Sequence, residues 1–139
     1  MRRYLLDTSA LLTLRDDEAG ADRVATLLAE ARDGRARCLG CFITLMEITY
    51  RVWRDEGETA GRLAHEQCLA LPIEWVHESP ALLKLAAEMK ARHPLSLADA
   101  WIAASAVESS AVLVHKDPEF KVVAIEQLEL PFKAKGRKK

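Results

Sequence analysis

The sequence predicts a single three-layer α/β domain with a mostly parallel central sheet. The chain has 139 residues, a length that suits one domain. Short continuous apolar runs, which are typical of parallel strands buried on both faces, alternate with segments of helical periodicity. No internal repeat is visible. Such alternation is typical of a parallel sheet that is covered by helices on both faces.

The predicted strands are five apolar runs of four or five residues each. They are residues 3–6, 38–42, 73–76, 111–114 and 122–125. The first run ends at Asp7, and the Asp7-Thr8-Ser9 segment that follows fits the cap of a helix.

Apolar residues spaced by three and four positions predict the helices between these strands. The helices are expected over residues 21–31, 45–56, 60–68, 81–89 and 96–107. Gly34 and Gly57 are expected to end the first two of them. The second has an apolar face that Met46, Tyr50 and Trp53 widen, and we expect this face to be buried on two sides.

Composition excludes several classes of protein. The longest stretch without a charged residue is 38–46, nine residues, whereas a membrane span takes about 20 apolar residues. Three cysteines, an odd number, in a chain without an export signal favour reduced thiols and a cytoplasmic location. Cys38 and Cys41 form a C-x-x-C segment, but no second pair completes a zinc site.

Charge is distributed unevenly along the chain. The net charge is −1, yet the last eight residues carry five bases and no acid, which leaves −6 for the rest. We therefore predict a globular domain over residues 1–131 and a basic tail over residues 132–139. The tail is either a nucleic-acid contact or a solvated end.

Four acidic residues are expected to meet at one edge of the sheet. Asp7 and Asp117 each follow a predicted strand. Glu47 lies in the first turn of the helix after the second strand, and Asp99 lies in the first turn of a helix that leads into strand 111–114. Because ligands of parallel α/β sheets bind at the carboxyl ends of the strands, these side chains predict a binding site there.

Helix capping is the alternative explanation for each acid alone. The caps or capping boxes would be Asp7, Asp117-Pro118, Thr44-x-x-Glu47 and Ser96-x-x-Asp99. Capping does not explain four clustered acids without matching bases, because neighbouring carboxylates repel one another. Oxygen ligands favour Mg²⁺ or Mn²⁺, and four carboxylates leave room for two ions. His115 is expected to be a polar edge residue that faces away from them.

The segments that carry these acids resemble the motifs of PIN-domain ribonucleases, specifically VapC-type toxins of prokaryotic toxin–antitoxin pairs. They are residues 6–12 (LDTSALL), 44–47 (TLME), 97–104 (LADAWIAA) and 114–120 (VHKDPEF). The resemblance covers nearly the whole chain and implies a three-layer α/β/α PIN-like fold. It also implies that Asp7, Glu47, Asp99 and Asp117 form the catalytic metal site, with Thr8 or Ser9 as a hydroxyl contact. Glu119 is a further candidate ligand, with solvent exposure as the alternative.

The resemblance also implies an activity and partners. The activity is that of a Mg²⁺- or Mn²⁺-dependent endoribonuclease, in which an activated water attacks tRNA, rRNA or mRNA. The implied partners are a second copy of the chain and an antitoxin whose C-terminal segment occludes the site. The apolar face from Leu45 to Trp53 and the small residues from Ala100 to Ala106 are candidate partner surfaces, with plain core as the alternative.

Basic residues are the candidate contacts to RNA. Arg15, Arg51, Arg54 and the basic tail are the candidates. Arg51 lies one helical turn beyond Glu47, so an ion pair between these two residues is the alternative.

Two other functions compete with the nuclease. A receiver-like phosphoacceptor domain also gathers acids at the carboxyl edge of a parallel sheet, but it needs an acidic pair after the first strand, where Leu5 and Leu6 precede a single Asp7. The other is a non-enzymatic protein- or RNA-binding module of the same fold. Such a module would be expected to lack one of the four acids, and none is missing.

Overall fold

The central sheet has five strands, and every neighbouring pair is parallel. The computed structural model describes residues 1–132. The strands are β1 (Arg3–Leu6), β2 (Arg37–Cys41), β3 (Ile73–Val76), β4 (Val112–His115) and β5 (Gln127–Glu129). Their order across the sheet is β3-β2-β1-β4-β5. The predicted three-layer fold is confirmed, and the sheet is parallel throughout rather than mostly so.

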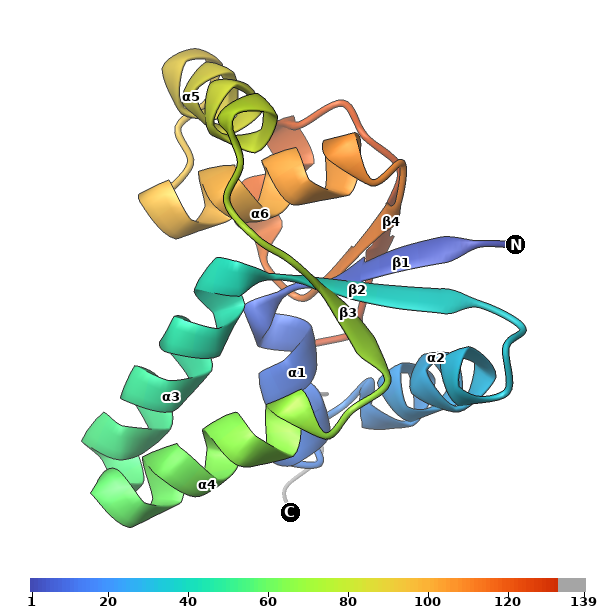
Figure 1. Cartoon of the computed structure of the whole chain (residues 1–139), viewed down its shortest axis with the longest axis vertical. Coiled ribbons are helices and arrows are strands. Elements are labelled where there is room, and N and C mark those ends of the chain that lie inside the picture. Colours follow the sequence, from blue (N-terminus) through green and yellow to red (C-terminus); the bar gives the residue numbers. More distant parts are fainter. Residues whose placement is uncertain (133–139) are drawn as a thin grey trace.

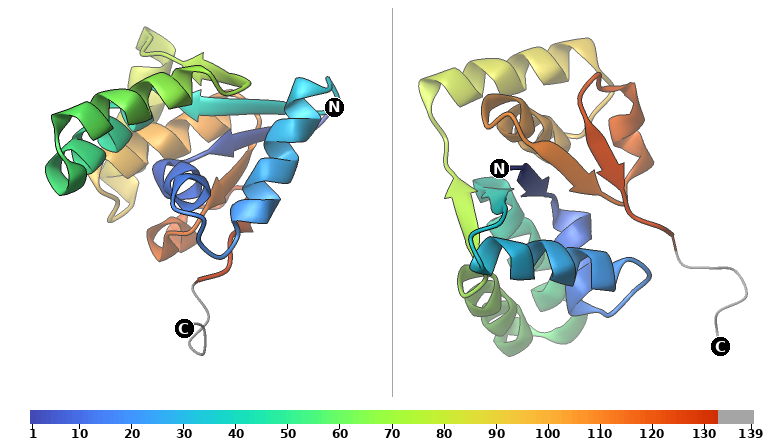
Figure 2. Two further views of the ribbon diagram at one scale, coloured as in Figure 1. Left: turned by 90° about the horizontal axis from the view of Figure 1, so that it is seen from below. Right: turned by 90° about the vertical axis from the view of Figure 1, so that its right-hand side faces the viewer.

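Helices cover both faces of this sheet. They are α1 (Thr8–Arg15), α2 (Ala21–Arg32), α3 (Phe42–Glu56), α4 (Glu58–Leu69), α5 (Pro80–Arg92) and α6 (Leu97–Glu108). Figure 1 shows α1 to α4 below the sheet and α5 with α6 above it, and Figure 2 shows the same layers from two other sides. Among residues 1–132, no helix has the length and apolar character needed to cross a membrane.

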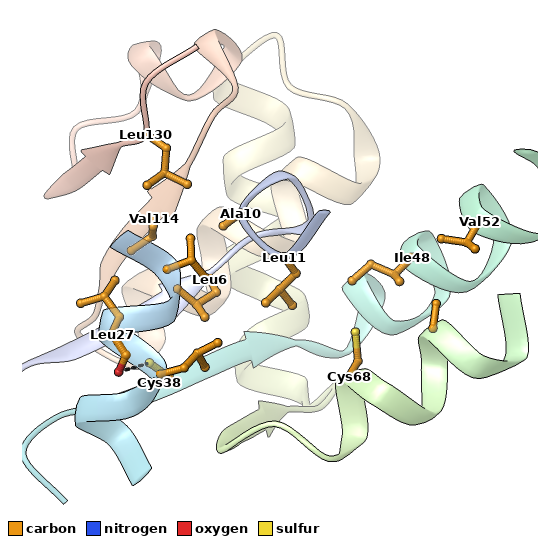
Figure 3. Packing of buried hydrophobic residues seen from close by; sticks show 13 residues of the cluster. Leu6, Ala10, Leu11, Leu27, Cys38, Ile48, Val52, Cys68, Val114 and Leu130 are labelled. Atoms are coloured by element: carbon orange, nitrogen blue, oxygen red, sulfur yellow. Dashed lines mark hydrogen bonds between the residues drawn. The ribbon is translucent and has the colours of Figure 1, made fainter. Parts of the chain in front are cut away.

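Alternation along the strands divides the core between the two faces. Leu5 packs into the cluster on the α6 side, whereas its neighbour Leu6 packs into the cluster on the side of α1 to α4. Figure 3 shows the second cluster, where Leu6 and Val114 from the sheet lie near Leu27 and Leu11 from the helices. The strands β1 and β4 are therefore buried on both faces of the sheet, which explains their continuous apolar sequences.

The two candidate partner surfaces have different outcomes. The small residues of α6 are core, since Ala100, Ala103, Ala104 and Ala106 are each no more than 1% exposed. The periodicity predicted that the apolar face of α3 would be buried on two sides, and this prediction is wrong. Met46, Tyr50 and Trp53 are 57%, 45% and 43% exposed, because α4 covers only one side of this helix.

The last predicted strand is wrong. A short 3₁₀ helix, η1 (Pro118–Val122), occupies its start, and β5 begins five residues later than predicted, at Gln127. Asp117 caps η1 and Pro118 opens it, so the chain turns before it extends. Phe120 in η1 and Val123 directly after it are buried, so this segment is apolar although it is not a strand.

The crossover point of the topology lies between β1 and β4. From β1 the chain proceeds to β2 on one side, whereas β4 and β5 lie on the other side. At this point the Asp7 amide donates to the Val114 carbonyl oxygen at 3.1 Å. Such a crossover is where open parallel sheets bind ligands. The predicted tail, apart from Phe132, lies outside the described residues, so the boundary after residue 131 remains a prediction.

Candidate metal centre

Asp7 is a buried carboxylate at the end of β1. Its side chain is the N-cap of α1 and accepts a hydrogen bond from the Ala10 amide at 2.8 Å. The Ser9 hydroxyl donates to the same carboxylate, at 2.7 and 2.9 Å from its two oxygens. Ser9 also accepts from the Lys116 amide at 2.9 Å, so it joins the ends of β1 and β4. The predicted cap is confirmed, and Asp7 is only 2% exposed.

Glu47 accepts a hydrogen bond from the Thr8 hydroxyl, which in turn contacts the Thr44 hydroxyl. Thr8 on α1 donates to a Glu47 carboxylate oxygen at 2.6 Å. The Thr44 hydroxyl lies 3.0 Å from that of Thr8 and is fully buried. Because α3 begins at Phe42, Thr44 lies inside the helix and cannot be its N-cap, so the predicted Thr44-x-x-Glu47 capping box is wrong. The spacing of three residues instead places both side chains on one helix face.

Asp99 lies in the first turn of α6, and Asp117 precedes η1. Ser96 is the N-cap of α6 and accepts from the Asp99 amide at 3.1 Å, as the sequence predicts. Asp117 caps η1 by accepting from the Glu119 amide at 2.9 Å. Carboxylate oxygens of Asp99, Asp117 and Glu119 all lie within 4.8 Å of one another. Glu119 is exposed, yet its carboxylate belongs to this group.

All four predicted acids line one cavity of about 240 Å³. Its lining residues are Asp7, Thr8, Ser9, Glu47, Arg51, Ser96, Asp99, Asp117 and Glu119. The cavity lies at the carboxyl ends of β1 and β4, where the sheet topology places a ligand site. Five of its nine side chains are carboxylates, and Arg51 is the one cation among them.

The environment of the cavity opposes ionisation of its acids. Burial, together with the charges of Asp117 and Glu47, raises the pKa of Asp7 from 3.8 to about 7, although hydrogen bonds from Ser9 and Ala10 act in the opposite direction. Burial and contacts with Glu119 and Asp117 raise the pKa of Asp99 from 3.8 to about 8. The hydrogen bonds of the helix cap therefore do not offset the rise in pKa that burial and neighbouring carboxylates cause.

One residue near the cavity, His115, differs from expectation, and the alternative proposed for Arg51 does not occur. His115 is buried, 1% exposed, rather than a polar edge residue, because β5 packs beside β4 and Gln127 lies 2.8 Å from its Nε2 atom. Its Nδ1 atom accepts from the Asp117 amide at 3.0 Å and helps to fix the turn. Within residues 1–132, the possible ion pair between Arg51 and Glu47 does not form.

The cysteines take no part in the cavity. Cys38, Cys41 and Cys68 are free and buried. The Cys38 thiol donates to the Leu27 carbonyl oxygen at 3.5 Å, as drawn in Figure 3. Burial raises the pKa of this thiol to about 11. The C-x-x-C segment is therefore part of the core.

The fold and the cavity define a class of α/β domain with an acidic ligand site at the crossover of a parallel sheet. The family model described as the PIN domain matches residues 4–126. The chain belongs to the PIN domain family, which confirms the family that the sequence motifs resemble.

Solved structures of similar fold come from several bacteria. A chain of VapBC2 from Rickettsia felis, bound to a DNA fragment from its promoter, is 17% identical with a TM-score of 0.75, covering 93% of this chain and 99% of that one. A chain of DNA-bound VapBC from Salmonella typhimurium is 19% identical with a TM-score of 0.72, covering 93% and 98%. VapC20 of Mycobacterium tuberculosis, a Sarcin-Ricin loop cleaving toxin, is 19% identical with a TM-score of 0.71, covering 92% and 99%. A comparison with curated proteins finds no match.

Proposed function

We propose that this protein is a divalent-metal-dependent endoribonuclease and the toxin of a toxin–antitoxin pair. The observation that carries the proposal is the gathering of Asp7, Glu47, Asp99 and Asp117 around one cavity. The single guanidinium of Arg51 cannot balance these charges, so additional positive charge is needed to keep the carboxylates ionised at neutral pH.

The donor set of the cavity fits Mg²⁺ or Mn²⁺. Carboxylate oxygens without histidine or cysteine ligands suit hard cations rather than zinc. The group formed by Asp99, Asp117 and Glu119 is compact enough to share one ion, and Asp7 and Glu47 line the same cavity.

We assign holding and positioning roles to the residues of the cavity. A divalent cation supplies activation of the attacking water and neutralises charge that develops on the phosphate. Asp7, Glu47, Asp99 and Asp117 hold the cation, while Thr8 and Ser9 fix the carboxylates of Glu47 and Asp7. In the hydrolysis, a P–O bond forms to water and the opposite P–O bond breaks, with a proton going to the leaving ribose oxygen.

The activity is tested with a labelled structured RNA, chosen because VapC20 is described as cleaving the Sarcin-Ricin loop. We expect the wild-type protein to cleave it in Mg²⁺ or Mn²⁺ and to stop when EDTA is added. Asp7→Asn should abolish cleavage, because an amide cannot supply the anionic ligand, while it can still cap α1. Circular dichroism should show that this variant remains folded.

Asp22→Asn is the matched control for this substitution. Asp22 also lies in the first turn of a helix, α2, but it is exposed and outside the cavity. It should retain wild-type activity. Cleavage by Asp7→Asn at the wild-type rate would rule out the assignment of this cavity as the nuclease site. Absence of metal-dependent cleavage by the wild-type protein would favour the binding-module alternative.

The receiver-like alternative is not favoured by the topology. Receiver-type domains have the strand order 2-1-3-4-5, whereas this sheet has the order β3-β2-β1-β4-β5.

A toxin role, an antitoxin partner and a homodimer belong to the same proposal. The VapBC structures that share the fold support the toxin role and the antitoxin partner. The homodimer is what the family resemblance implies. The exposed side chains Met46, Tyr50 and Trp53 on α3 offer apolar surface for such partners. Expression in a bacterial host should arrest growth, and Asp7→Asn should relieve the arrest. Three free, buried cysteines are consistent with the cytoplasm as the place of action.

A further inference from the structure

Arg51 differs from the other two arginines that the sequence puts forward for RNA contact. Arg15 is committed to Glu56, with two hydrogen bonds of 2.9 and 3.0 Å between α1 and α3. Arg54 donates to Asp55 at 3.0 Å, and its guanidinium lies 5.7 Å from the centre of the Tyr50 ring. For Arg51, the part of the chain that the structure describes offers neither an ion pair nor a side-chain hydrogen bond.

The position of Arg51 makes this lack of a partner informative. It lines the same cavity as Asp7, Glu47, Asp99, Asp117 and Glu119, yet it pairs with none of them. It lies four residues after Glu47 on α3, one turn and about 6 Å along the helix axis. A guanidinium that served only to neutralise the acids would be expected within ion-pair distance of a carboxylate.

The negative charge of the molecule indicates that RNA binding at the cavity needs a basic side chain. The chain without its last eight residues has a net charge of −6, so an RNA strand is repelled on approaching the acidic cavity. Arginine presents a planar set of donors that binds a phosphate through two parallel hydrogen bonds. Building on the proposed function, we propose that Arg51 binds a backbone phosphate of the RNA substrate beside the phosphate that is cleaved.

The test is RNA binding in an Asp7→Asn background, so that the labelled RNA stays intact in Mg²⁺. Adding Arg51→Ala should weaken binding about ten- to a hundredfold, as expected for loss of a charged hydrogen bond. The slope of log affinity against log salt should become shallower by about 0.7 to 1, the value for one phosphate contact. Arg51→Lys should retain the salt slope and recover part of the affinity, because it keeps the charge and loses the planar fork.

The matched control is Arg35→Ala. Arg35 precedes β2, at the opposite edge of the sheet from the cavity, and pairs with Asp33 at 3.2 Å. It should leave affinity and salt slope unchanged. In an otherwise wild-type chain, Arg51→Ala should also retain the rise in melting temperature that Mn²⁺ produces, because Arg51 is not a ligand of the ion.

The outcomes separate the two proposals. If the wild-type protein cleaves RNA and Asp7→Asn does not, but Arg51→Ala changes neither affinity nor salt slope, the role of Arg51 is wrong and the nuclease assignment stands. If Arg51→Ala also loses the Mn²⁺ response, Arg51 acts on the metal site and not on RNA. If the wild-type protein shows no metal-dependent cleavage, the nuclease assignment fails, and the role of Arg51 fails with it.

Discussion

Hydroxyl groups rather than charges fix two of the carboxylates of the cavity, those of Asp7 and Glu47. Ser9 donates to Asp7, and Thr8 donates to Glu47. Thr44 does not line the cavity, but its buried hydroxyl contacts Thr8 at 3.0 Å. Hydrogen-bond partners behind metal ligands orient those ligands, so we interpret Thr44 as a positioning residue that acts on Glu47 through Thr8.

Thr44→Val should weaken Mn²⁺ binding about ten- to a hundredfold, the range typical of residues behind a metal ligand. The reason is that Thr8 loses a hydrogen-bond partner, and the Glu47 carboxylate is then held less rigidly. Calorimetric titration with Mn²⁺ measures the effect, and Thr44→Ser, which keeps the hydroxyl, should bind Mn²⁺ like the wild type. Equal Mn²⁺ affinity in Thr44→Val and wild type would show that Thr44 only fills space.

The sequence could indicate the acids of the cavity, but it could not indicate that the hydroxyls of Thr44 and Thr8 contact each other behind Glu47. Asp7 and Asp117 follow strands, so topology alone predicts that they meet. The contact between Thr8 and Thr44 depends on how α1 packs against α3, and these residues are 36 positions apart. The spacing of Thr44 and Glu47 is a signal for a shared helix face, but a capping box has the same spacing.

At the scale of elements, α3, which carries Glu47 and Arg51, packs closely and antiparallel against α4. Gly61 on α4 permits this approach. A Cβ atom at position 61 would lie 2.7 Å from Trp53 Cβ and 2.8 Å from the Thr49 carbonyl oxygen. These distances are shorter than van der Waals contact, so only glycine fits without movement of the helices.

Gly61→Ala should therefore destabilise the protein by about 1–3 kcal/mol, the usual cost of overpacking. Helix propensity alone predicts the opposite sign, a gain of roughly 1 kcal/mol for alanine over glycine. Urea unfolding followed by circular dichroism measures the difference in free energy of unfolding. A stabilised Gly61→Ala variant would contradict the close contact between α3 and α4.

Elements whose sequence reflects burial on both faces were the most predictable. Residues in β1 and β4 contact helices on both sides, so continuous apolar runs identified these strands. The strand predicted over 122–125 is wrong because Val123, buried, and Ile125, partly buried, lie in the loop between η1 and β5 rather than in a strand. Likewise, the apolar face of α3 predicted burial, but burial depends on which neighbours the fold provides.

At the scale of the whole molecule, the raised pKa values of Asp7 and Asp99 couple stability to pH. Both pKa values rise from 3.8 in the unfolded chain, to about 7 and about 8 in the fold. Between these values the folded state binds more protons than the unfolded state, so the free energy of unfolding falls as pH rises. The stabilising contribution of these two groups is present in full below about pH 4, and it is lost as the pH rises through 7 and 8.

In EDTA, the contribution of these two groups should lower the melting temperature between pH 5 and pH 8. The gain on adding Mn²⁺ should be larger at pH 8 than at pH 5, because protons compete with the ion for the same oxygens. The control is the double variant Asp7→Asn, Asp99→Asn, which should lose both effects. An identical pH dependence in wild type and double variant would contradict the raised pKa values.

The most direct measurement of the central idea is the anomalous scattering of a crystal equilibrated with Mn²⁺. We expect an ion in the cavity, at about 2.0–2.4 Å from carboxylate oxygens of Asp99 and Asp117, the closely spaced acids of the cavity. Asp22→Asn should leave this peak in place, and Asp99→Asn should remove or weaken it. A cavity without anomalous density at saturating Mn²⁺, with its carboxylates paired to Arg51 or protonated, would contradict a shared cation.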